Sequence, residues 1–143
     1  MSATARTEGR AIAGDRATLL IRSIRLDALM SGASGLLLAA GAAVLDGVLG
    51  APTALLVALG IFLLGYAGML LLLARMGAPA MGVKAVIAGN ALWGVASVVA
   101  VLADWLTLTN AGTVITVAQA AAVALLAEAQ STGLRRSRQS TSR

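Results

Sequence analysis

The chain has 143 residues, of which 59% are hydrophobic and 12% are charged, whereas about a quarter of the residues of an average soluble protein are charged. This composition excludes an ordinary soluble domain. The sequence contains no cysteine and no histidine, which removes disulfides, thiol nucleophiles, imidazole bases and the usual ligands of zinc, haem and iron–sulfur clusters. We therefore expect a chain that is not an enzyme and that holds no cofactor and no metal.

Charged residues separate four long uncharged blocks. A helix needs about 20 consecutive apolar residues to cross a bilayer core, and each block is close to or above that length. The sequence predicts transmembrane spans at about 28–48, 53–74, 83–105 and 112–130. The net charge of +5 does not indicate a nucleic-acid partner, because the basic residues lie beside the spans without the interleaved aromatic residues of a base-stacking surface.

Residues 1–27 form a basic tail ahead of the first span. Its last part, ATLLIRSIRLD at 17–27, mixes apolar residues with arginines, so it either lies along the membrane surface as a short amphipathic helix or extends the first span outward. An alternative for the first block is a cleaved signal peptide, since AAGAA at 39–43 offers small residues of the kind found at cleavage sites. The long segment ahead of the block and the three spans after it favour a membrane span.

Small residues recur at helical spacing in the spans. Helices in lipid associate through close packing of small residues and through interhelical hydrogen bonds. These positions indicate packing inside the bundle, or alternatively a seam between copies of the chain. The predicted packing positions are Gly35 in the first span, Gly65 and Gly68 in the second, and Gly94 in the third.

The connections between spans are short. Pro52 in LGAPT (49–53) fits a helix start, where proline loses no helical hydrogen bond. RMGAPAMG at 75–82 ends a helix and reverses the chain, and LTNAG at 108–112 supplies a cap for the next helix. Because short connections make successive helices antiparallel neighbours, we predict an all-α fold, a transmembrane up-down four-helix bundle, followed by a disordered basic tail at 131–143.

The basic residues all fall on one side of this layout. The positive-inside rule assigns that side to the cytoplasm, so we expect a multi-pass protein with both termini cytoplasmic. Basic tails can also attract anionic lipid, at about 1 kcal/mol per residue, although topology alone explains them. The residues that set the topology are Arg22, Arg25, Arg75, Lys84, Arg135, Arg136 and Arg138.

GNALWGVAS at 89–97 places an amide inside the third span. At about 1.5 Å per residue, Asn90 lies about 9 Å inward from Lys84, and Tyr66 reaches a similar depth in the second span. An unpaired amide in hydrocarbon costs several kcal/mol, so it should face the bundle interior. We predict a polar cluster of Ser31, Ser34, Tyr66 and Asn90.

A second polar group is expected at the opposite end of the bundle. Asp46 and Asp104 lie near the outer ends of the first and third spans, and Gln119 lies about 10 Å into the fourth. Together they could line an outer vestibule that binds a cation or an organic amine, because acidic groups at membrane depth usually line water-filled cavities. The alternative is that the two aspartates are simply solvated at the interface.

Three stretches carry a resemblance, namely RLDALMSGASGLLLAAG at 25–41, AGNALWGVASVVA at 88–100 and AQAAAVALLAEAQ at 118–130. They look like segments of small uncharacterised four-span bacterial membrane proteins. The resemblance implies a four-helix bundle in the bacterial cytoplasmic (inner) membrane and no particular activity. Small multidrug transporters have a similar size but typically carry an acidic residue in the middle of the first span, where this chain has GLLLAAG.

Two functions follow as hypotheses. The first is a non-catalytic integral membrane protein that acts as an accessory or structural subunit, in a homo-oligomer or a larger membrane complex, with the lipid bilayer as its surroundings. The alternative is a small transporter or an ion- or amine-binding protein that uses acidic and amide residues in the bundle.

Overall fold

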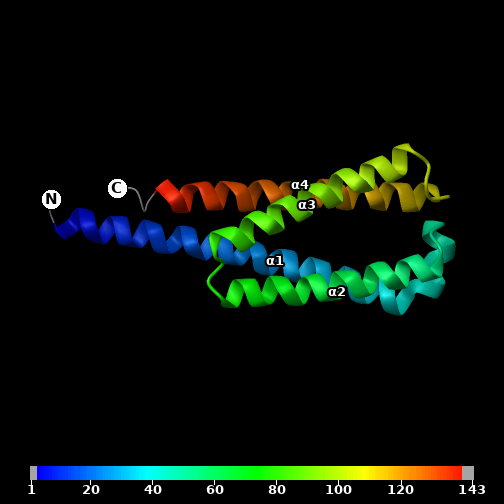
Figure 1. Ribbon diagram of the computed structural model, residues 1–143, viewed down its shortest axis with the longest axis horizontal. Helices are drawn as coiled ribbons and strands as arrows, with labels where there is room; N and C mark the ends of the chain where they lie inside the picture. Colours follow the sequence, from blue (N-terminus) through cyan, green and yellow to red (C-terminus); the bar gives the residue numbers. More distant parts are fainter. Residues whose placement is uncertain (1–2, 140–143) are drawn as a thin grey trace.

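Four helices account for the structure, a computed structural model that describes residues 3–139 and, within them, the side chains of residues 18–135. They are α1 (Ala3–Leu49), α2 (Thr53–Arg75), α3 (Ala80–Leu102) and α4 (Asn110–Gln139) (Figure 1). No strand occurs in the described part of the chain. The predicted all-α class is confirmed.

Each helix contains a stretch long and apolar enough to cross a membrane: Thr18–Leu49, Thr53–Arg75, Ala80–Leu102 and Asn110–Arg135. Large apolar side chains such as Leu36, Ile61 and Leu125 are more than half exposed on the outside of the bundle. An apolar exterior suits lipid and would be a liability in water. By the length and composition of its helices, the chain is a multi-pass membrane protein.

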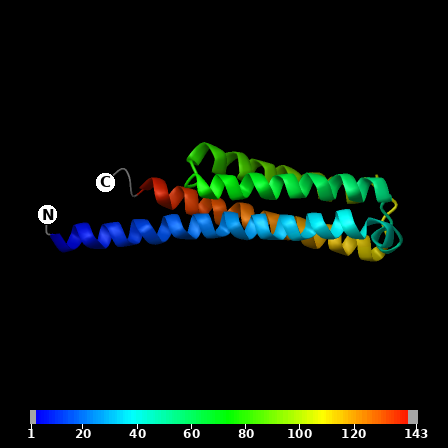
Figure 2. The same ribbon diagram turned by 90° about the horizontal axis from the view of Figure 1, so that it is seen from below.

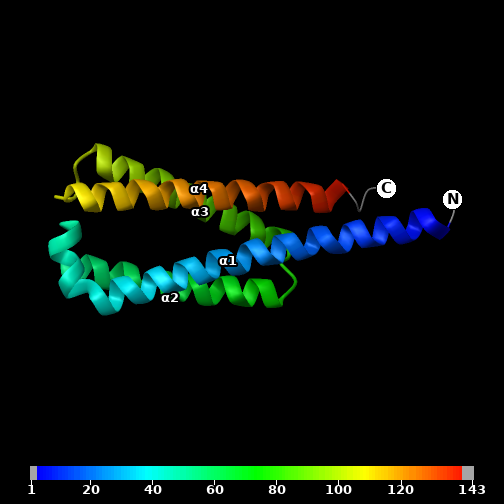
Figure 3. The same cartoon turned by 180° about the vertical axis from the view of Figure 1, so that it is seen from behind.

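The helices run up and down between two ends of the bundle. Both described chain ends and the α2–α3 turn lie at one end, here called the terminal end, and the other two connections lie at the distal end (Figures 1 and 2). α1 packs against α2 and α4, α3 packs against α4, and α2 and α3 scarcely touch. The bundle thus consists of an α1–α2 layer and an α3–α4 layer, which stay joined through α1 and α4 (Figure 3).

The α1–α2 layer is held by a close backbone approach. A Cβ atom added at Gly60 would lie 2.6 Å from the backbone nitrogen of Ala39 and 2.7 Å from the carbonyl oxygen of Gly35. A Cβ atom at Gly35 would lie 2.8 Å from the carbonyl oxygen of Gly60. Glycine at both positions lets the helices meet backbone to backbone, as small residues do in membrane bundles.

At the distal end, the last turn of α1 is tied to the start of α4. The backbone amide of Thr109 donates to the carbonyl oxygen of Leu49 at 3.0 Å, and its hydroxyl donates to the carbonyl oxygen of Val48 at 2.5 Å. A Cβ atom at Gly112 would collide with the carbonyl oxygen of Leu49. The two layers are therefore fastened together on the α1–α4 side.

The helix bounds bear on both tails. α1 is continuous from Ala3, so of the two alternatives for residues 17–27 the structure has the one in which they extend the first span. Residues 131–139 continue α4, so this part of the expected disordered tail is helical. Residues 1–2 and 140–143 lie outside the described residues.

The packing glycines are also corrected in part. A Cβ atom added at Gly94 would lie 3.6 Å from the carbonyl oxygen of Ala120 in α4, so this glycine faces α4 as expected. Gly65 and Gly68 have no atom within 4 Å of an added Cβ and lie exposed on the outer side of α2. Gly60, on a different face of α2, makes the contact with Gly35 instead.

Candidate functional site

The structure buries one carboxylate in the bundle. Asp27 of α1 is 1% exposed and lies within the first span, nine residues beyond Thr18. Its Oδ2 atom accepts hydrogen bonds from the amide of Asn90 at 2.7 Å and from the amide of Gln130 at 2.9 Å. Its Oδ1 atom accepts a longer bond from the hydroxyl of Ser31 at 3.4 Å.

A further contact adds α2 to this group of hydrogen-bonded side chains. The hydroxyl of Tyr66 in α2 donates to Oδ1 of Asn90 at 2.9 Å, and the same asparagine also contacts Oε1 of Gln130 at 3.5 Å. All four helices thus contribute a side chain. The polar cluster in the structure consists of Asp27, Ser31, Tyr66, Asn90 and Gln130.

The polar cluster lies at membrane depth. Asn90 is six residues from Lys84 and Tyr66 is nine residues from Arg75, so both side chains start about 9 to 14 Å inside the basic terminal end. Within the described residues, every hydrogen bond of the Asp27 carboxylate comes from a neutral donor. An ionised carboxylate only accepts hydrogen bonds, so the cluster presents a set of donors suited to a negative charge.

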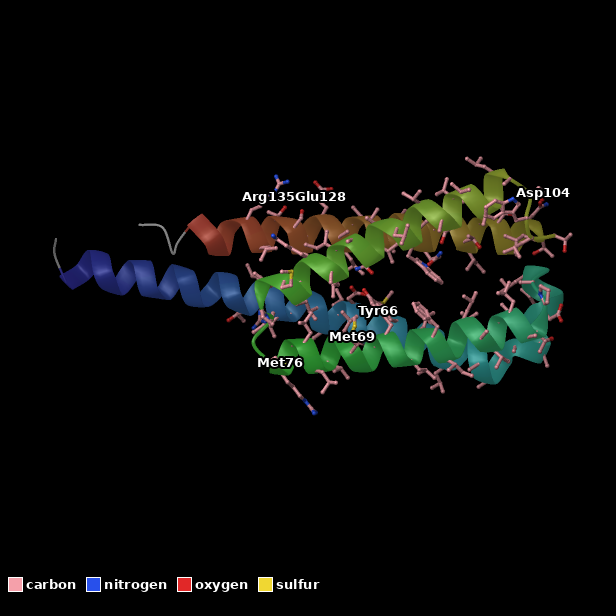
Figure 4. The ribbon with its side chains drawn as sticks, viewed as in Figure 1. Tyr66, Met69, Met76, Asp104, Glu128 and Arg135 are labelled. Atoms are coloured by element: carbon pink, nitrogen blue, oxygen red, sulfur yellow. The ribbon has the colours of Figure 1, made fainter. Side chains whose placement is uncertain are left out.

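A cavity of about 160 Å³ adjoins the cluster. All four helices line it, and its walls are mostly apolar. α3 leans away from α2 toward the distal end, and Tyr66 lies between the two layers (Figure 4). The lining residues are Asp27, Met30, Ser31, Ser34, Phe62, Leu63, Tyr66, Gly89, Asn90, Trp93, Gln119, Ala122, Val123 and Leu126.

Aromatic residues gather at this cavity. The chain has one phenylalanine, one tyrosine and two tryptophans, and three of these four residues line it. Phe62 stacks between the others, with ring centroids 6.3 Å from Tyr66 and 5.8 Å from Trp93. In a chain that is only 3% aromatic, this concentration marks the cavity as a distinct site.

The distal wall of the cavity holds a second set of hydrogen bonds. The indole nitrogen of Trp93 donates to Oε1 of Gln119 at 3.0 Å, and the amide nitrogen of Gln119 donates to the hydroxyl of Ser97 at 2.9 Å. The Trp93 ring is therefore fixed by stacking on one side and by a hydrogen bond on its edge.

Three residues expected to cluster do so, namely Ser31, Tyr66 and Asn90. Ser34 lines the cavity but is exposed, and among the described residues no hydrogen bond joins it to the other three. The sequence prediction does not include Asp27 and Gln130, because both lie at the predicted ends of spans. Depth was the available signal, since Gln130 lies five residues, or about 7.5 Å, inside Arg135.

The outer vestibule is corrected. Oδ2 of Asp46 accepts bonds from the backbone nitrogen of Thr53 at 3.2 Å and from its hydroxyl at 2.7 Å, so this aspartate caps the start of α2. Asp104 is exposed in the α3–α4 connection at the distal end (Figure 4). Gln119 belongs to the cavity. The three residues do not form one site.

The basic residues expected to set topology are exposed where their side chains are described, namely Arg22, Arg25, Arg75, Lys84 and Arg135. Arg136 and Arg138 lie in the last turns of α4, where only the backbone is described. Among the described side chains, no group of three or more acidic residues could hold a metal ion.

Comparison with known proteins does not add to this picture. No family model matches the chain, and no curated protein and no solved structure was found to be similar to it. The candidate site therefore rests on its geometry.

Proposed function

We propose that the protein is a small integral membrane protein of the bacterial inner membrane that binds an organic cation in the cavity. Asp27 supplies the negative charge, and Phe62, Tyr66 and Trp93 supply the aromatic wall. The observation that carries the proposal is a buried carboxylate, bonded only to neutral groups among the described residues, at the polar end of an aromatic-lined cavity.

The Asp27 carboxylate is buried inside the membrane-spanning bundle. A charged side chain inside a membrane is expensive, and such residues typically mark ion or substrate pathways. A ligand cation beside Asp27 would offset that cost by Coulomb attraction, which is strong where water is excluded. Cations also bind the faces of aromatic rings within about 6 Å, at about 0.5 to 2 kcal/mol each. The cavity combines both kinds of partner.

The membrane orientation is part of the proposal. The exposed basic residues flank the terminal end of the bundle, and the positive-inside rule then places both termini in the cytoplasm. Asp27 would lie in the cytoplasmic half of the membrane. Binding is the primary function proposed; transport would additionally require the cavity to be exposed to each side in turn.

A second candidate is an accessory or structural subunit. It is supported by the completeness of the polar cluster, since no buried polar side-chain atom among the described residues lacks a hydrogen-bond partner. A fully satisfied cluster can simply hold helices together. The exposed Gly65 and Gly68 would then suit contact with a second copy or another membrane protein, and the basic tails would suit anionic lipid.

The test measures binding of phenethylammonium to the protein in lipid nanodiscs by isothermal titration, with empty nanodiscs subtracted. We expect saturable binding that Asp27→Asn abolishes and that the matched variant Asp104→Asn retains, because Asp104 lies in the exposed distal connection. Equal binding by both variants would contradict the proposal. No binding, together with a defined complex in the native mass of the gently extracted protein, would support the accessory subunit.

A further inference from the structure

The two carboxylate oxygen atoms of Asp27 differ in the number and length of the hydrogen bonds that they accept. Oδ2 accepts two short bonds, from the amides of Asn90 and Gln130, at 2.7 and 2.9 Å. Oδ1 accepts only the 3.4 Å bond from Ser31, although a carboxylate has about four acceptor positions in all. Ser31 lines the cavity and Gln130 does not. Asn90 also lines the cavity, as does Asp27 itself, so what distinguishes Oδ1 is its spare acceptor capacity.

The cavity is the size of one aromatic ring. Its volume is about 160 Å³, and an engineered cavity of about 150 Å³ in another protein binds benzene. The cavity is open where Met30 and Phe62 are more than half exposed. Its volume therefore accommodates one ring with a short chain, and any larger part of a ligand would lie outside it.

The spacing of the charged and aromatic parts sets the shape of the ligand. Phe62 lies one turn distal to Tyr66, and Trp93 lies just under one turn distal to Asn90, which corresponds to about 4.5 to 6 Å along the bundle. The stacked pair Phe62 and Trp93 is therefore about one turn away from the polar cluster. A ring separated from its nitrogen by one or two carbon atoms matches this spacing.

From these three observations we infer that the ligand is a single-ring arylalkyl ammonium ion with at least one N–H group. Its N–H donates to Oδ1 of Asp27, and its ring packs against Phe62 and Trp93. This inference rests on the proposed function and adds the ligand class to it. A quaternary ammonium of the same shape keeps the charge but loses the donor, so it leaves Oδ1 without a strong hydrogen bond.

The test compares three cations in nanodiscs by titration: phenethylammonium, its N,N,N-trimethyl analogue and tetraphenylphosphonium. Because hydrogen bonds to charged groups are among the stronger ones, we expect phenethylammonium to bind at least tenfold more tightly than the trimethyl analogue. We expect tetraphenylphosphonium to bind at least tenfold more weakly than phenethylammonium, because it has no N–H donor and most of it would lie outside the cavity.

Two variants connect these affinities to the site. Asp27→Asn should abolish phenethylammonium binding. Phe62→Leu, at a side chain that is 55% exposed and makes no hydrogen bond in the polar cluster, should weaken it several-fold in a protein that still folds. This second variant keeps the inference testable if Asp27→Asn does not fold.

The outcomes separate the two proposals. Asp27-dependent binding of tetraphenylphosphonium as tight as that of phenethylammonium, or equal affinity for phenethylammonium and its trimethyl analogue, would overturn the ligand class and leave cation binding intact. Unchanged phenethylammonium affinity in Phe62→Leu would overturn the placement of the ring. Failure of every cation to bind the unmodified protein would overturn the proposed function and this inference with it.

Discussion

Replacing Gly60 by alanine tests the close contact between α1 and α2. The added Cβ would lie 2.6 to 2.8 Å from three atoms of α1, two of which belong to the backbone. Ordinary contacts of a Cβ atom begin at about 3.4 Å, so the helices must separate by several tenths of an ångström. Overpacking of this kind costs about 1 to 3 kcal/mol, and the helix propensity of alanine returns up to about 1 kcal/mol.

The matched control is Gly65→Ala on the same helix. Nothing lies within 4 Å of a Cβ added there, so this variant gains helix propensity without a clash. We expect Gly60→Ala to lower the free energy of unfolding by about 1 to 2 kcal/mol and Gly65→Ala to leave it unchanged or raise it slightly. Unfolding in mixed micelles, followed by circular dichroism against the fraction of denaturing detergent, measures both.

The two variants are compared by their unfolding midpoints. If both variants shift the unfolding midpoint equally, α1 and α2 do not meet at Gly60. If Gly65→Ala is the more harmful, that face of α2 carries the packing contact, as the sequence alone predicted.

Three further predictions address other parts of the molecule. Thr53→Val removes the hydroxyl that donates to Asp46 and should cost about 1 kcal/mol of stability without changing cation binding. A changed affinity for the cation would indicate that Asp46 takes part in the binding site. Asn90→Leu leaves buried partners unpaired and should lower the free energy of unfolding by about 1 to 3 kcal/mol. Adding Tyr66→Phe to this variant should cost little more stability, because the tyrosine hydroxyl has already lost its acceptor. Fully additive losses of stability would show that the Tyr66–Asn90 bond is not formed. In a chain without native cysteine, Met76→Cys should react with a membrane-impermeant maleimide only after the cytoplasmic side is opened, whereas Trp105→Cys should react in intact cells; the reverse pattern would contradict the proposed orientation.

The spans could be predicted because charged side chains are costly in hydrocarbon and are therefore rare within transmembrane helices. Uncharged blocks located all four helices, and the short connections predicted their antiparallel order. The same rule misplaced the start of the first span, since it took Asp27 as a boundary. A carboxylate supplied with donors from other helices can lie inside the bundle, and no local pattern around residue 27 reveals donors that are 63 and 103 residues away.

The rotation of each helix about its axis accounts for other differences between the predicted and the observed contacts. Depth arithmetic matched Tyr66 with Asn90, and these residues are hydrogen-bonded. Depth does not say which side of a helix faces its neighbour. Gly60 and Gly65 are about 140° apart around α2, so only the packed structure distinguishes the contact from the exposed face. Asp46 was misassigned for a simpler reason, because its partner Thr53 is local and the pairing could have been read as a helix cap.

The stacked position of Trp93 gives the cavity its own optical reporter. The only other tryptophan, Trp105, is 72% exposed at the distal end, so a Trp105→Phe chain would emit from the cavity wall alone. Indole fluorescence responds to nearby charge and polarity, and Trp93 is held by Phe62 on its face and Gln119 on its edge. Occupation of the cavity should therefore shift or quench this emission without any attached dye.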